Sequence, residues 1–119
     1  MHNNWIKFLA LPLCIACTGF AYEEETTIPA RQEKDECVEL NKGATLTFQF
    51  RSSISAKFDI HRHVTETETI VLDKANGTTK RGPKTVIIEE GGVYCLNWKN
   101  RYREDMQLNF KIDFDNPNP

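Results

Sequence analysis

Two histidines and an aspartate occupy alternate positions of one short segment, and side chains of these types bind transition metals. Residues 56–64 alternate between apolar and polar side chains, which predicts a strand with one buried and one solvated face. Asp59, His61 and His63 then share the solvated face, with about 6.8 Å between the Cα atoms of each residue and the next one on that face. A His-x-His pair beside a carboxylate suits copper or zinc, and a further ligand must come from another element. The alternative is that both histidines are ordinary residues of a polar sheet face.

A basic loop after residues 93–98 is a second candidate site. The cluster consists of Lys99, Arg101, Tyr102 and Arg103. Loops at the end of a scaffold commonly carry recognition, so this cluster is suited to an acidic or sugar-phosphate partner. The alternative is that its charges only balance the neighbouring Glu104 and Asp105, since mixed charges are ordinary at a protein surface.

The sequence offers little for catalysis. Nucleophilic catalysis needs a nucleophile, a base and an orienting group within mutual reach, and no serine, cysteine or histidine stands in a recognisable motif of that kind. The carboxylate pairs 89–90 and 104–105 fall at predicted turns. The formal net charge is −2, which indicates neither a nucleic-acid surface nor a polybasic membrane patch. We therefore predict a protein that is not an enzyme and has no cofactor, apart from copper or zinc under the metal alternative.

Residues 1–21 have the features of a signal peptide. Lys7 precedes an apolar run at 8–16, and Gly19 and Ala21 place small residues three and one before a cleavage point, as signal peptidase requires. The apolar run is too short to cross about 30 Å of hydrocarbon. We expect the mature chain to begin at Tyr22, in the periplasm or outside the cell.

Lipid attachment at Cys17 is an alternative way of processing this leader. Ala16 provides the small residue that precedes the modified cysteine of bacterial lipoproteins, although Cys14 stands where a leucine is usual. Such an anchor would attach the protein to a membrane. The acidic segment 22–36 is expected to be a flexible N-terminal arm, which would act as a tether in that case.

Cysteine parity supports export. Removal of residues 1–21 leaves Cys37 and Cys95, an even number in a chain destined for an oxidising compartment. We predict that these two cysteines form a disulfide, which would contribute on the order of 4 kcal/mol by restricting the unfolded chain.

Short alternating segments separated by glycine-bearing turns predict an all-β fold. The expected strands are 37–40, 45–50, 56–64, 69–72, 84–89, 93–98 and 106–114. Residues 51–53 are expected to end one strand. Residues 73–83 are expected to form a polar loop or a loose hairpin, with a turn at Asn76 and Gly77. Tyr94, Leu96 and Trp98 should face the core. The prediction is an antiparallel β-sandwich (jelly-roll type) of about six to eight strands, with the domain at 37–115 and a disordered tail at 116–119.

The spacing of these core and turn residues resembles the GOLD β-sandwich and small exported bacterial proteins of this type. The matching positions, which span residues 37–114, are Gly43, Leu46, Phe48, Phe58, Ile60, Gly92, Tyr94, Leu96, Trp98 and Asn100. The resemblance implies a GOLD-like, non-catalytic recognition domain. Cys95 directly follows Tyr94, which departs from the eukaryotic members, so a trafficking role is not carried over.

Together these features predict an exported binding or interaction domain, periplasmic or attached to the envelope. Its expected partner is a protein or lipid of the cell envelope rather than a nucleic acid, with a membrane contact only if Cys17 is lipidated. The alternative is a periplasmic copper- or zinc-binding protein that uses Asp59, His61 and His63.

Overall fold

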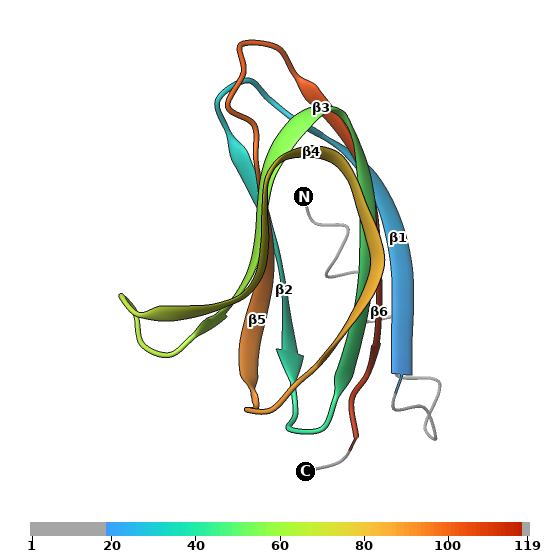
Figure 1. Ribbon diagram of the computed structural model, residues 1–119, viewed down its shortest axis with the longest axis vertical. Helices are drawn as coiled ribbons and strands as arrows, with labels where there is room; N and C mark the ends of the chain where they lie inside the picture. The colour runs from blue at the N-terminus through green and yellow to red at the C-terminus, as the bar shows by residue number, and fades with distance from the viewer. Residues whose placement is uncertain (1–18, 118–119) are drawn as a thin grey trace.

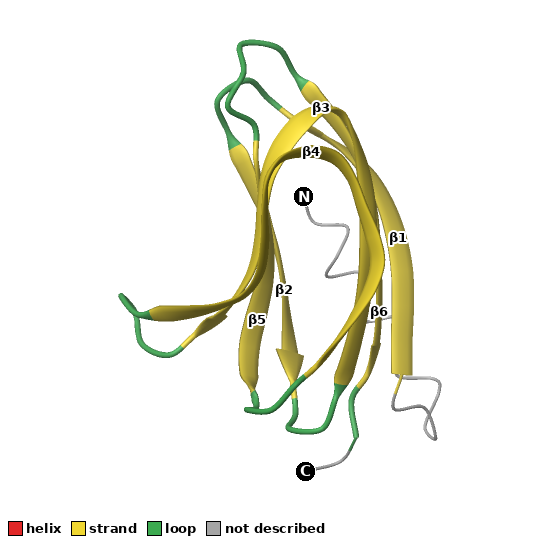
Figure 2. Ribbon diagram, in the orientation of Figure 1, coloured by secondary structure: helices red, strands yellow, loops and turns green. Residues whose placement is uncertain are grey.

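The computed structural model describes residues 19–117, which form a single antiparallel sheet folded over into two facing layers (Figures 1 and 2). The strands are β1 (Gly19–Ile28), β2 (Glu33–Leu40), β3 (Thr45–His63), β4 (Thr69–Ile87), β5 (Gly92–Lys99) and β6 (Met106–Asp115). Within 19–117 no helix has the length and apolar character needed to cross a membrane. The predicted all-β class is confirmed.

The long strands β3 and β4 belong to both layers. Residues 45–52 of β3 pair with β6, whereas 57–62 pair with β5, giving the order β1-β6-β3-β5-β2. β4 follows the other edge of β3 along most of its length. One layer therefore contains β1, β6 and the first half of β3, and the other contains β2, β5 and its second half. The two layers are covalently continuous through the bend in these strands (Figure 1).

The bend corrects two sequence-based expectations. Residues 51–53 do not end a strand, and all of 73–83 is strand within β4 rather than a loop or a loose hairpin. Serine hydroxyls stabilise the bend: Ser52 Oγ donates to the Ile54 carbonyl at 2.8 Å, and Ser53 Oγ accepts from the Gln107 amide at 2.9 Å. Gly77, expected in a turn, has a φ of +81° and lies beside a shift in register between β3 and β4. Gly77 therefore permits a shift in register within a continuous strand instead of forming a turn.

Gly82 is required by the close approach of β4 to β3. Its φ is +87°, and a Cβ atom built on it would lie 2.4 Å from the carbonyl oxygen of Phe48. No side chain fits at that distance, and the backbone conformation itself disfavours other residues.

The core lies between the layers and is dominated by aromatic rings. Tyr94, Leu96 and Trp98 are all buried, as predicted. The Trp98 ring stacks on Phe110 with a centroid distance of 4.8 Å and meets Phe50 edge-on at 5.8 Å. Because Phe50 and Phe110 belong to the first layer and Trp98 to the second, these contacts join the layers.

The acidic arm predicted at 22–36 is instead mostly ordered strand. β1 pairs with β6 without interruption from Gly19 opposite Asp115 to Ile28 opposite Met106, and Ile28 is buried. The sequence of β1 is polar enough to suggest a solvated tether, but the side chains of β1 that point inward have partners on β2. Tyr22 donates a hydrogen bond to the buried carboxylate of Glu36 across the open edge of the sandwich. Burial and this bond to Glu36 raise the pKa of the Tyr22 hydroxyl far above its usual value.

The start of the expected disordered tail is also held in place. The Asn41 amide donates to Asn116 Oδ1 at 2.7 Å, and Asn41 Nδ2 donates to the Pro117 carbonyl at 2.6 Å. Residues 118–119 lie outside the described part of the chain. The turn between β2 and β3 thus fixes the segment that follows β6.

Candidate functional site

The outer face of the layer formed by β2, β5 and β3 carries both the disulfide and the predicted metal-binding residues. Cys37 on β2 lies opposite Cys95 on β5, and Cys95 lies opposite His61 on β3. The Cys37–Cys95 disulfide is present, with a Cα–Cα distance of 4.0 Å, which confirms the predicted pairing. Cys37 is exposed on an edge strand, whereas Cys95 is 3% exposed. Three strands therefore place two sulfurs and an imidazole in one row.

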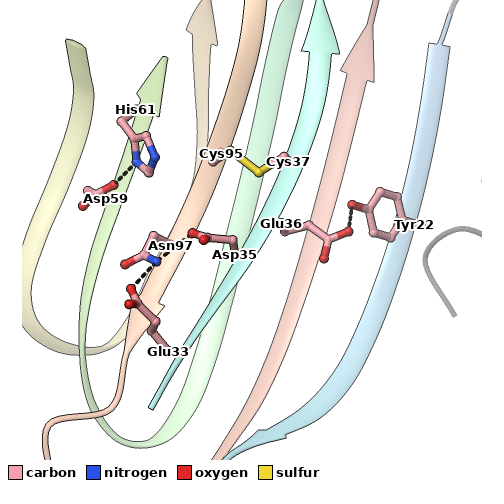
Figure 3. Close-up of a disulfide and its surroundings, with 9 residues drawn as sticks. All are labelled: Tyr22, Glu33, Asp35, Glu36, Cys37, Asp59, His61, Cys95 and Asn97. Carbon is pink, nitrogen blue, oxygen red and sulfur yellow. Dashed lines mark hydrogen bonds and ion pairs between the residues drawn. A yellow bond between two sulfur atoms is a disulfide. The ribbon is translucent and has the colours of Figure 1, made fainter. Parts of the chain in front are cut away.

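The structure brings Cys95 close to two of the three predicted metal-binding residues. Asp59 Oδ1 accepts a hydrogen bond from His61 Nδ1 at 2.7 Å (Figure 3), so Asp59 orients His61. The rings of His61 and His63 meet edge-on with a centroid distance of 4.8 Å. The third potential ligand atom is Cys95 Sγ: one atom each from His61, His63 and Cys95 lie within 4.8 Å of one another. Cys95 was not predicted as a member of this cluster, because only the register of β5 against β3 brings it opposite His61.

An acidic groove of about 300 Å³ adjoins this cluster. It is lined by Glu33, Asp35, Asp59, His61, Thr69, Val71, Asn97 and Lys99. Asn97, which is 5% exposed, donates through Nδ2 to Glu33 Oε1 at 2.8 Å and to Asp35 Oδ1 at 2.7 Å (Figure 3). Its Oδ1 is buried with no hydrogen-bond partner among residues 19–117. The groove is therefore lined by carboxylates, an environment that favours cations or hydrogen-bond donors.

The predicted basic loop lies at one end of the sandwich, where Asn100 fixes it. Asn100 is 2% exposed, and its Nδ2 contacts the carbonyls of Ile28 at 3.0 Å, Pro29 at 3.2 Å and Glu104 at 2.8 Å. Its Oδ1 accepts from the Tyr102 amide at 3.0 Å. One side chain therefore connects the turn between β1 and β2 to the loop between β5 and β6.

The result is a basic surface with a hollow. We define the basic end as Arg31, Lys99, Arg101, Tyr102 and Arg103, all of which are exposed. Arg31 has a φ of +65°, and its amide donates to the Tyr102 carbonyl at 3.1 Å. A hollow of about 620 Å³ lies between the two loops. Arg31 joins the predicted cluster although it lies 71 positions before Tyr102, the residue it contacts, and no local pattern in the sequence indicates this contact.

A third charged group stabilises the bend of β4. Arg81 donates to both oxygens of Asp73, from Nε at 2.9 Å and from Nη2 at 2.7 Å, and Lys84 Nζ donates at 2.9 Å. Burial on its own would raise the pKa of Asp73, but the hydrogen bonds from Arg81 and Lys84 outweigh it and hold that pKa below its usual value. Since the charges of Asp73, Arg81 and Lys84 are paired with one another, we interpret the cluster as structural.

Comparison with known proteins identifies similar folds but no family. No family model and no curated protein matches the sequence. Among solved structures, PliG of Aeromonas hydrophila, a periplasmic inhibitor of g-type lysozyme, superposes with a TM-score of 0.59 at 11% identity, over 85% of this chain and 90% of that one. PliG of Salmonella Typhimurium gives 0.55 at 11% identity, over 79% and 90%. The Yersinia pseudotuberculosis-derived mitogen gives 0.50 at 17% identity, over 84% and 88%.

At these identities the likeness establishes the fold: a small all-β domain of a kind found in periplasmic proteins. It does not extend to the GOLD family, and that more specific resemblance stays a prediction. The roles predicted for Asp59, His61 and His63, and for the basic loop, also remain predictions. Cys17 and most of the signal peptide lie outside the described residues.

Proposed function

We propose that this chain is an exported, non-catalytic β-sandwich that binds a protein partner in the cell envelope, and that this partner is an enzyme that degrades the cell wall. The observation that carries the proposal is the basic end, where Asn100 holds two loops in place around a hollow. A preorganised surface binds with little loss of conformational entropy. The fold likeness to two periplasmic lysozyme inhibitors supports the same class of function.

The charge of this surface suits such a partner. Glycoside hydrolases of most families have a pair of carboxyl groups on either side of the scissile bond, so an inhibitor that blocks the cleft benefits from positive charge. Lys99, Arg101 and Arg103 present that charge, and Tyr102, 47% exposed, adds an aromatic anchor. Exposed arginine and tyrosine are typical of residues that dominate binding energy. The GOLD-like resemblance equally implies a non-catalytic recognition role.

Inhibition of lysozyme activity tests the proposal. The purified, oxidised protein is added to g-type lysozyme acting on a peptidoglycan suspension, with c-type lysozyme run in parallel. We expect near-stoichiometric inhibition of at least one of these enzymes. Absence of both inhibition and binding for every lysozyme class tested would contradict the proposed partner.

Charge reversal locates the binding surface. Arg101→Glu combined with Arg103→Glu should weaken inhibition by at least about tenfold, because each reversal places like charges against the partner. Lys42→Glu combined with Lys111→Glu makes the same change in net charge at exposed positions outside the basic end. If both double variants inhibit equally, the basic end is not the binding surface.

Export with removal of a leader is part of this proposal, and the structure sharpens its test. Phe20 is 8% exposed, and its ring centroid lies 5.3 Å from that of Phe114. Cleavage after Ala21 would therefore remove a packed residue of β1. Processing at Cys17 with lipid attachment would retain it. The intact mass of protein recovered from the cell envelope distinguishes a chain that starts at Tyr22 from one that starts at a lipidated Cys17. Full-length protein in the cytosol would contradict export.

The second candidate function is periplasmic binding of copper or zinc through Asp59, His61 and His63. The pairing of the two imidazole rings favours it. Equilibrium dialysis of the oxidised protein against Zn²⁺ and Cu²⁺ is the test. Uptake that is unchanged in the His61→Ala/His63→Ala variant would rule it out.

A further inference from the structure

We propose that reduction of the Cys37–Cys95 disulfide creates a metal site from His61, His63 and Cys95, suited to a thiophilic ion such as Cu⁺ or Zn²⁺. One potential ligand atom from each of these three side chains lies within 4.8 Å of the others. Ligand atoms around a tetrahedral ion are about 3.5 Å apart when metal–ligand distances are about 2.0–2.3 Å. Side-chain rotations that shorten the separations by about 1 Å therefore complete the arrangement. The inference is independent of the binding function of the basic end.

His61 is already oriented for this role. Its Nδ1 is 2.7 Å from Asp59 Oδ1, and because an ionised carboxylate can only accept, Nδ1 carries the proton and Nε2 keeps its lone pair. Figure 3 shows the second ring nitrogen on the side of the imidazole that faces Cys95. A carboxylate that holds the far nitrogen of a metal-binding histidine is a recurrent second-sphere arrangement. Asp59 is thus a positioning residue for His61.

The disulfide controls the site because the thiolate, not the disulfide sulfur, is the strong ligand. A dithiol reductant supplies the electrons. Its first thiolate bonds to the exposed Cys37 sulfur, the S–S bond breaks, and Cys95 leaves as a thiolate. The second thiolate of the reductant then attacks its own sulfur in the mixed disulfide and releases Cys37, which takes up a proton. The reductant loses two electrons and becomes a disulfide, and the Cys95 thiolate binds the ion.

The surroundings favour a cation. The adjoining groove carries Glu33 and Asp35 beside Asp59, with Lys99 as its single cationic lining residue. The buried Oδ1 of Asn97, which has no partner among residues 19–117, adds a further electronegative atom. Carboxylates that line a cleft raise the local concentration of cations. His63 is exposed, so an ion can reach the cluster from solvent.

Two single-cysteine variants provide a matched test. Cys37→Ser and Cys95→Ser both lack the disulfide, but only the first retains the proposed thiolate ligand. We expect Cys37→Ser to bind one Zn²⁺ per chain without reductant, at least about 100-fold more tightly than Cys95→Ser in competition with a chelator. Co²⁺ should give a thiolate-to-metal charge-transfer band with Cys37→Ser alone. Adding His61→Ala to Cys37→Ser should abolish binding, and adding Asp59→Asn should weaken it by about 10- to 100-fold.

Wild-type protein tests the redox dependence directly. The oxidised chain and the chain reduced with a phosphine, which provides no thiol ligand, are titrated with Zn²⁺ and, anaerobically, with Cu⁺. Tight one-to-one binding only after reduction supports the proposal. The ion that binds with the lower dissociation constant is the preferred metal. Equal binding by oxidised and reduced protein, or equal binding by the two cysteine variants, overturns it. Fluorescence of Trp98, which is fully buried, reports folding, and a reduced chain that unfolds also overturns it.

Discussion

Asn100 is predicted to hold the basic end together, and two substitutions, only one of which keeps the side-chain volume, separate its hydrogen bonding from its volume. In Asn100→Ala the carbonyls of Ile28 and Glu104 lose their donor, and the Tyr102 amide loses its acceptor. In Asn100→Asp the acceptor is retained, but the amide donor is replaced by a carboxylate oxygen that faces backbone carbonyls. The side-chain shape is nearly unchanged.

The expected magnitudes follow from these contacts. Three well-formed hydrogen bonds at about 1 kcal/mol each give a loss of about 3 kcal/mol in unfolding free energy for Asn100→Ala. Asn100→Asp should cost more, about 4 kcal/mol or above, because a buried charge beside carbonyl oxygens lacks a compensating donor. Protonation restores a donor, so the folded-state pKa of the introduced carboxyl is raised. The additional loss of unfolding free energy in Asn100→Asp is therefore present above that pKa and disappears as the pH falls through it.

Urea unfolding monitored by the fluorescence of Trp98 measures both effects, since this residue is the only tryptophan after the predicted leader. The measurements are made at pH 7 and repeated towards pH 4. We expect the order wild type, Asn100→Ala, Asn100→Asp at neutral pH, with the two variants converging in acid. An Asn100→Asp variant at least as stable as Asn100→Ala at pH 7 would refute the assigned hydrogen-bond directions. Both variants should also weaken lysozyme inhibition.

Further predictions concern stability. Replacing both cysteines, Cys37→Ser with Cys95→Ser, should lower the unfolding free energy by about 4 kcal/mol, since the bridged positions are 58 residues apart; a urea midpoint within error of wild type would contradict this. Gly82→Ala should destabilise the fold by more than about 2 kcal/mol because its Cβ would meet a backbone oxygen at 2.4 Å, whereas Gly77→Ala, which meets nothing within 4 Å, should cost less in the same assay. The pKa of Asp73 is lowered in the folded protein, so the stabilising effect of this carboxylate is present above about pH 4 and is lost as the pH falls through the folded-state pKa. The difference in urea midpoint between wild type and Asp73→Asn should therefore shrink between pH 6 and pH 2. A constant difference would refute this prediction.

Elements with strict alternation of apolar and polar side chains could be predicted from the sequence. β6 has this pattern, and one of its faces is buried, so the local sequence carries the information. In β5 the aromatic residues Tyr94 and Trp98 stand an even number of positions apart, so they share a face, and both are buried. The disulfide followed from cysteine parity.

The elements that could not be predicted depend on contacts between distant residues. β1 is rich in glutamate and threonine, and its order comes from pairing with β6 and from the bond between Tyr22 and Glu36. The continuity of β3 through its serines depends on two different partner strands, because β6 and β5 pair with different halves of it. Cys95 could not be recognised as a neighbour of His61 without the register of β5 against β3.

The pairing of β1 with β6 has a consequence for how the protein is made. The first strand of the described chain has its partner in the last one, with Gly19 opposite Asp115, so the first layer cannot be completed until β6 has been synthesised. Such long-range pairing forms slowly, because the entropy of closing a long loop is lost before the contact is made. The inward side chains of β1 therefore stay uncovered by this layer until translation is nearly complete.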